Sequence, residues 1–235
     1  MTGTESENGK GASSGGVAAG ASPVHVEGDL SPVLSRWLWL VKWLLLIPHL
    51  IVLVFLWLAF VLSTVAAFFA ILFTGRYPRR IFDFNVGVLR WTWRVNFYGY
   101  SALGTDRYPA FRLAAAPEDE GRLDIAYPEH LSRGLVLVKW WLLALPHYAV
   151  VAAFSVGPWQ YPGLATVLLL IAAVALLFTG RYPQGLFDLL VGMDRWLFRV
   201  VAYAALMTDV YPPFRLDQGA REPGAGASPA VGTAW

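Results

Sequence analysis

The sequence predicts an all-α membrane protein made of two duplicated helical hairpins, each followed by an amphipathic helix at the membrane interface. Three observations predict this class: apolar residues gather in long runs, the chain repeats itself, and arginine and tryptophan line the segment after each run. Hydrophobic residues make up 57% of the 235 residues and charged residues 14%, whereas a typical soluble domain is about a quarter charged. The apolar excess therefore indicates membrane segments rather than an enlarged core.

Three stretches occur twice, in the same order. They are VKWLLLIPH, FTGRYP and TDRYPAFRL in the first copy, and VKWWLLALPH, FTGRYP and TDVYPPFRL in the second. This internal duplication predicts repeats over residues 23–113 and 122–216. Between them, 114–121 carries the acidic stretch PEDE and is predicted to be a solvated linker. Residues 1–22 and 217–235 are rich in glycine, serine and alanine, which predicts disordered tails.

Each repeat begins with a short alternation of apolar and polar residues. Val24 and Val26 flank a histidine in the first repeat, and Leu123 and Ile125 flank an aspartate in the second. Such alternation predicts short strands. We expect the opening stretches to pair with the closing YPxFRL stretches in a small sheet on the cytoplasmic side of the membrane.

The long apolar runs, about 37–74 and 136–179, exceed the roughly 20 residues that one membrane span needs. Two tight passes fit each run better, with a turn near residues 63–64 in the first run and at GPWQYPG, 157–163, in the second. The second limbs are short for a full span. They either extend through the GRYP boundary or belong to hairpins that dip into the bilayer without crossing it.

Positive charge indicates the side of the membrane on which the ends lie. The predicted turns contain no lysine or arginine, whereas arginines flank the opposite ends of both runs. Cytoplasmic loops carry such an excess, so both termini and the linker are expected in the cytoplasm of a bacterial inner membrane. Two crossings per repeat would give both repeats the same orientation, related by an axis along the membrane normal.

The motif FTGRYP predicts a helix that ends at the membrane boundary. Thr74 can hydrogen-bond back to the helix, Gly75 is the residue type favoured past a helix end, and Pro78 prevents continuation. Arg76 suits the negative end of the helix dipole and lipid phosphates, and Tyr77 suits the headgroup level. The alternative is that this pair selects one specific lipid phosphate.

The segments that follow, about 79–103 and 184–207, place aspartate, glycine and two arginines in one helical stripe among apolar and tryptophan side chains. This pattern predicts a helix lying in the interface with its arginines at the phosphates. The alternative is a third spanning helix, which would give six crossings and cost about 2.5–3.5 kcal/mol for each central arginine. The candidate headgroup ligands of both repeats are Arg76, Tyr77, Arg90, Arg94, Arg181, Tyr182, Arg195 and Arg199.

Two histidines, His49 and His147, each follow a proline inside an apolar run. An ionisable side chain at membrane depth is a candidate for proton relay or ligand binding. The alternative is a neutral imidazole that satisfies a backbone group freed by the proline or bonds across the repeats. His25 and His130 lie in polar stretches and are expected at the surface.

Several classes of chemistry find no support in the sequence. The chain has no cysteine, which excludes disulfides, thiol catalysis and cysteine-ligated metal sites. No dinucleotide, P-loop, zinc-protease or nucleophile-elbow pattern is present, so neither a cofactor, a metal nor a catalytic residue is predicted. Basic residues follow the membrane boundary instead of forming a nucleic-acid-binding patch.

Taken together, the IPH of the first helix, LFTGRYP, FDxxVGxxRWxxRV and the closing TDxYPxF resemble a bacterial membrane-protein family, the domain-of-unknown-function family 4389. The resemblance covers nearly all of residues 23–216 in tandem copies. It implies an integral membrane protein, but it supplies no activity, substrate or catalytic residue.

The leading hypothesis is therefore a non-enzymatic scaffold that organises anionic lipid or a protein partner at the membrane, as a monomer or homo-oligomer. The alternative is a small transporter or channel in which His49 and His147 face each other across the axis between parallel repeats.

Overall fold

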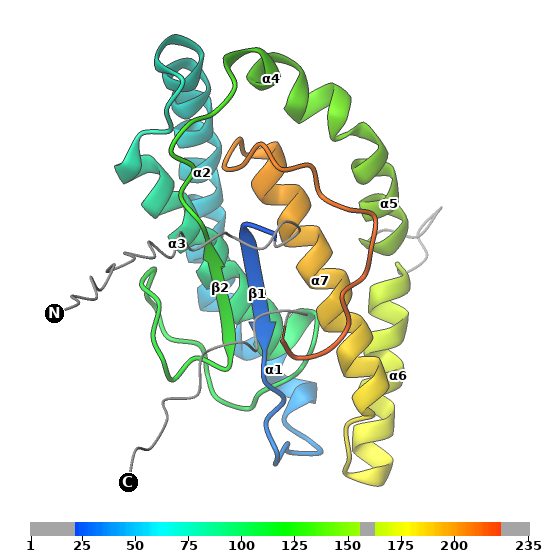
Figure 1. The fold of residues 1–235 in the computed structure, drawn as a ribbon. Helices are drawn as coiled ribbons and strands as arrows, with labels where there is room; N and C mark the ends of the chain where they lie inside the picture. The colour runs from blue at the N-terminus through cyan, green and yellow to red at the C-terminus, as the bar shows by residue number, and fades with distance from the viewer. Residues whose placement is uncertain (1–21, 156–162, 222–235) are drawn as a thin grey trace, which may run out of the picture.

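The computed structural model describes residues 22–155 and 163–221. Two antiparallel strands, β1 (Val24–Gly28) and β2 (Gly121–Ile125), lie in the centre of the molecule. Figure 1 shows the strands in front of two long helices, α3 (Arg79–Val95) and α7 (Gln184–Ala204), with the apolar helices to either side. The mostly helical fold with two short strands confirms the predicted secondary-structure class.

The apolar run of the first repeat forms a short helix, α1 (Trp39–Leu45), and then one long helix, α2 (Ile47–Thr74). The predicted turn at 63–64 is wrong, because both residues lie inside α2. Their hydroxyl groups are satisfied without breaking the helix: Ser63 Oγ lies 2.6 Å from Asn85 Oδ1, and Asn85 Nδ2 lies 3.3 Å from Thr64 Oγ1. The apolar run of the first repeat therefore contains one long helix and no hairpin.

The FTGRYP motif ends α2 as the sequence predicts. Gly75 adopts the left-handed conformation with φ of 71°, and Thr74 Oγ1 donates to the carbonyl of Ala70 at 2.7 Å. The second copy repeats both features, with φ of 69° at Gly180 and a 2.7 Å bond from Thr179 to Ala175. A residue with a Cβ would be strained at either glycine, which explains why both copies keep it.

In the second repeat the run is divided into α4 (Arg133–Val138), the π-helix η2 (Lys139–Leu143), α5 (Leu145–Ser155) and α6 (Leu164–Thr179). The extra residue of VKWWLLALPH falls in η2, as expected because a π-turn accommodates a one-residue insertion within a helix.

Figure 1 shows α6 continuing in the direction of α5 instead of folding back beside it, which corrects the predicted second hairpin. Most of the predicted turn at 157–163 lies outside the described residues.

The two strands confirm the alternating stretches but not their predicted partners. Val26 pairs with Leu123 at the centre of the antiparallel register, so the opening stretches pair with each other and not with the closing stretches. Each strand lies against the helix of the other repeat. Arg90 on α3 donates to the Leu123 carbonyl at 2.9 Å, and Arg195 on α7 donates to the Val26 carbonyl at 2.8 Å.

The helices α3 and α7, which were predicted to lie at an interface, form the centre of the core. Trp93 is fully buried and packs against Phe97, at the start of the π-helix η1 (Asn96–Tyr100), and against Phe198 of α7. The tryptophans of these helices therefore pack against protein. The strands cover these helices on one side and the apolar helices cover the other, which leaves little of either helix exposed.

The first residues of the predicted C-terminal tail make contacts with the rest of the fold. Asp217, where the C-terminal tail was expected to begin, accepts a 2.7 Å hydrogen bond from Arg199, and the Ala220 carbonyl accepts one from Gly28 at 3.0 Å. Residues 222–235 of that predicted tail, and residues 1–21 of the N-terminal one, lie outside the described residues. In the part of the chain that the structure describes, two helical stretches, Ile47–Thr74 and Arg133–Ala152, are long and apolar enough to cross a membrane.

Candidate functional site

A buried lysine joins the first helix of each repeat to its closing TD motif. Lys42 Nζ donates to the Thr105 carbonyl at 2.6 Å and lies 2.9 Å from Asp106 Oδ1. In the second repeat Lys139 makes the same contacts with Thr208 and Asp209. Both lysines are at most 2% exposed, so the aspartate compensates a charge that would otherwise be costly to bury.

The histidines lie under the aromatic residues of the closing motif. The His49 ring stacks on Phe111 with ring centroids 3.8 Å apart, and its Nδ1 accepts a 3.0 Å hydrogen bond from Trp91 Nε1. His147 stacks on Phe214 at 4.2 Å, and neither of its ring nitrogens has a hydrogen-bond partner among the described residues. Each histidine is thus enclosed by aromatic side chains of its own repeat.

The stripe arginines bind protein groups in the interior. Besides the contacts of Arg90 and Arg195 with the strands, Arg94 pairs with Asp119 at 3.0 Å and Arg199 pairs with Asp217 at 2.7 Å. These four arginines were predicted to reach lipid phosphates. Their guanidinium groups are instead engaged by backbone carbonyls and carboxylates of the protein.

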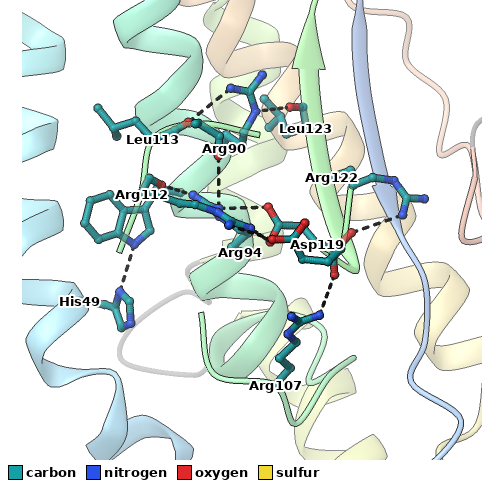
Figure 2. A network of polar contacts seen from close by, with 12 residues as sticks. His49, Arg90, Arg94, Arg107, Arg112, Leu113, Asp119, Arg122 and Leu123 are labelled. Carbon is teal, nitrogen blue, oxygen red and sulfur yellow. Dashed lines mark hydrogen bonds and ion pairs between the residues drawn. The ribbon is translucent and has the colours of Figure 1, made fainter. Parts of the chain in front are cut away.

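Asp119, in the linker between the repeats, is the centre of a polar network (Figure 2). Its carboxylate also accepts from Arg112 Nη2 at 2.7 Å, while Arg112 Nη1 pairs with Glu118 at 2.9 Å. Arg122, on β2, donates to the backbone carbonyl of Asp119 at 3.3 Å. The acidic linker is therefore not merely solvated: it folds back and neutralises the arginines beside the sheet.

The four remaining headgroup candidates separate into exposed arginines and covered tyrosines. Arg76 and Arg181 are exposed just past the ends of α2 and α6. Tyr77 is 1% exposed, and its hydroxyl accepts a 2.9 Å hydrogen bond from Asn85 Nδ2. The hydroxyl of Tyr182 is also buried, and burial raises its pKa. Only the two arginines are placed where a lipid phosphate can reach them.

Sequence analysis missed one buried acid, Asp194 on α7. Its side chain is 8% exposed, and its Oδ2 has no hydrogen-bond partner within the described part of the chain. Burial raises the pKa of this carboxyl group to about 7. The signal was present in the repeat alignment, because the matching position of the first repeat is Leu89, an apolar residue.

Metal ligands do not cluster in the described residues, where no group of three or more histidine, aspartate or glutamate side chains could hold an ion. His25 and His130 are exposed, as predicted.

The domain-of-unknown-function family DUF4389 has a model that matches the chain twice, over residues 36–112 and 137–215. The chain belongs to this family. The two matches confirm tandem copies of the DUF4389 domain, and the boundaries exclude both β-strands, which lie before each match. No curated protein and no solved structure matches the chain.

Proposed function

We propose that this tandem DUF4389 protein is an integral membrane protein that organises anionic lipid and carries out no reaction of its own. The observation that carries the proposal is the outer face of α2. Large apolar side chains are exposed along its whole length, including Val54 at 67%, Phe55 at 68% and Phe73 at 73%. A long apolar helix in a soluble core would be covered, yet only 17% of the apolar window of α2 is buried.

The outer face of the two strands is polar, unlike the outer face of α2. This difference supports a defined orientation of the protein relative to the membrane. The outer face of the two strands carries polar side chains, among them Glu27 and Arg122, which pair at 3.0 Å. We place this face toward the cytoplasm and the outer faces of α2 and α6 in the bilayer. The exposed Arg76 and Arg181 then lie beside lipid phosphates, where a guanidinium group forms bidentate hydrogen bonds.

A transporter built around the histidines has less support. Aromatic rings of the same repeat pack on His49 and on His147, and a conduction path needs polar groups that line it.

Vesicle flotation of the purified full chain tests the proposal. We expect the protein to stay with vesicles through washes in high salt and alkali, and to prefer vesicles containing phosphatidylglycerol over phosphatidylcholine alone. The Arg76→Gln/Arg181→Gln double variant should stay inserted but lose part of that preference. Release by salt would contradict membrane insertion, and equal binding to both vesicle types would contradict the lipid-organising role.

A further inference from the structure

A groove of about 640 Å³ lies between the two repeats, within the size range of roughly 300–1,000 Å³ typical of ligand sites. Trp57, Phe60 and Phe68 of α2 form one wall, and Trp140 of η2 and Tyr148 of α5 form the other. Side chains of α7 form its floor. The surface of the groove is almost wholly apolar, which suits a hydrocarbon chain and offers nothing to a polar ligand.

Several exposed arginines lie near one end of this groove. Arg76, Arg79 and Arg80 follow the end of α2, about 10 Å along the helix from the groove residue Phe69. Arg133, which starts the helix leading to the opposite wall, lies against Gly75: a Cβ built there would be 3.4 Å from its Nε. We call Arg76, Arg79, Arg80 and Arg133 the first collar.

The first collar has more positive charge than its acidic neighbours can neutralise. Arg79 pairs with Asp83 at 3.2 Å, and Glu129 lies two residues before Leu131, which hydrogen-bonds to the Gly75 carbonyl. The remaining collar arginines are exposed and make no ion pair recorded among the described residues. Four arginines against two carboxylates leave a net charge of about +2 beside an apolar groove.

We infer that this groove and the first collar together bind one anionic phospholipid, with an acyl chain between α2 and the second repeat and the phosphate on the collar arginines. This inference rests on the proposed function, because it requires the groove to face the bilayer. A zwitterionic lipid would fill the groove equally well, but its ammonium group would offset the attraction of the phosphate to the collar.

The two repeats can be compared at this site, because the second repeat lacks some of the arginines and phenylalanines of the first. The residues that match Arg79 and Arg80 are Gln184 and Gly185, so its collar contains only Arg36 and Arg181. The positions of Phe60 and Phe68 are occupied by Ala165 and Ala173. The inference therefore assigns one specific lipid site to the chain, at the end of α2, and not two equivalent sites.

Native mass spectrometry of the full chain in detergent, titrated with phosphatidylglycerol or phosphatidylcholine, tests this inference. The wild-type protein should bind one phosphatidylglycerol more tightly than any further copy. Changing the collar to the residues of the second repeat, Arg79→Gln/Arg80→Gly, should weaken that first binding about tenfold, because the phosphate loses charge-assisted hydrogen bonds. The control variant Arg221→Gln, at an exposed arginine outside both the collar and the groove lining, should leave it unchanged.

The groove itself is tested with Val65→Trp, which places a large ring on an exposed, groove-lining position of α2 without disturbing the core. It should abolish the tight binding of phosphatidylglycerol, while Leu58→Trp, equally exposed on α2 but outside the groove lining, should not. Wild-type affinity in both the collar variant and Val65→Trp would overturn the site. If those variants bind normally and vesicle flotation still favours anionic lipid, the proposed function stands and only the site fails.

Discussion

Tyr77 and Tyr182 occupy matching positions in the two repeats, but their hydroxyl groups have different surroundings. In the first repeat the hydroxyl is hydrogen-bonded to Asn85, whereas in the second it is buried without a partner among the described residues, near the carboxyl group of Asp194. The lysine and TD contacts, by contrast, are the same in both repeats. Contacts kept in both copies maintain the fold, and contacts that differ mark where the copies have specialised.

The shared lysines provide the strongest test of this comparison. Lys42→Met and Lys139→Met should each lower the free energy of unfolding by about 3 kcal/mol or more, because each leaves a partly buried aspartate without its cation. The stability of both variants is measured by thermal unfolding in detergent, monitored by tryptophan fluorescence. Glu129→Gln, an exposed change, should have little effect. A large loss in only one repeat would show that the contact is not equivalent in the two copies.

Asp194 is expected to make stability depend on pH. Its pKa in the fold, about 7, lies above the ordinary value of 3.8, so its ionisation adds no cost to folding below pH 4 and its full cost above pH 7. The difference corresponds to roughly 4 kcal/mol as an upper estimate. Asp194→Leu, which restores the residue type of the first repeat, should raise the melting temperature at pH 8 and leave it unchanged at pH 4.

The neutral variant Asp194→Asn separates ionisation from polarity at the same position. It should also remove the loss of stability between pH 4 and pH 7. An unchanged pH profile in both variants would show that Asp194 is not the group responsible.

Replacing the two histidines should have smaller effects on stability, and these effects should differ between the repeats. His49→Phe leaves the indole N–H of Trp91 unpaired in the interior, at a cost of about 1–3 kcal/mol. His147→Phe removes no hydrogen bond of this kind and keeps the stack on Phe214, so its effect should be close to zero. The melting temperatures of the two variants test this difference. Equal losses of stability would contradict the expected difference between the two histidines.

The two helix ends should show a small and equal loss of stability. Gly75→Ala and Gly180→Ala each force an L-residue into the left-handed conformation, at about 1 kcal/mol. The second variant also requires the exposed side chain of Arg36 to move, which is inexpensive because that side chain is flexible. A difference of several degrees in melting temperature between the two would indicate that the repeats end their helices in different ways.

Local chemistry explains which features could be predicted from the sequence. The helix ends at Gly75 and Gly180, and the strands at Val24 and Leu123, follow from backbone preferences and alternation within a few residues. The partner of Ser63 and Thr64 inside α2 could not be predicted, because Asn85 is a residue of another helix. Likewise the arginine stripe has the same periodicity whether it faces phosphates or carbonyls, and only the tertiary structure distinguishes the two.

The placement of the strands has a consequence for the history of the chain. Arg195 of the second repeat covers β1 of the first, and Arg90 of the first covers β2 of the second, so a lone repeat would contain one unpaired strand and a helix arginine with no strand to bind. Two separate copies could meet both needs only by exchanging strands around a twofold axis. The tandem chain is thus equivalent to a strand-swapped homodimer joined by residues 114–121, and that fusion freed each half to change its sequence independently.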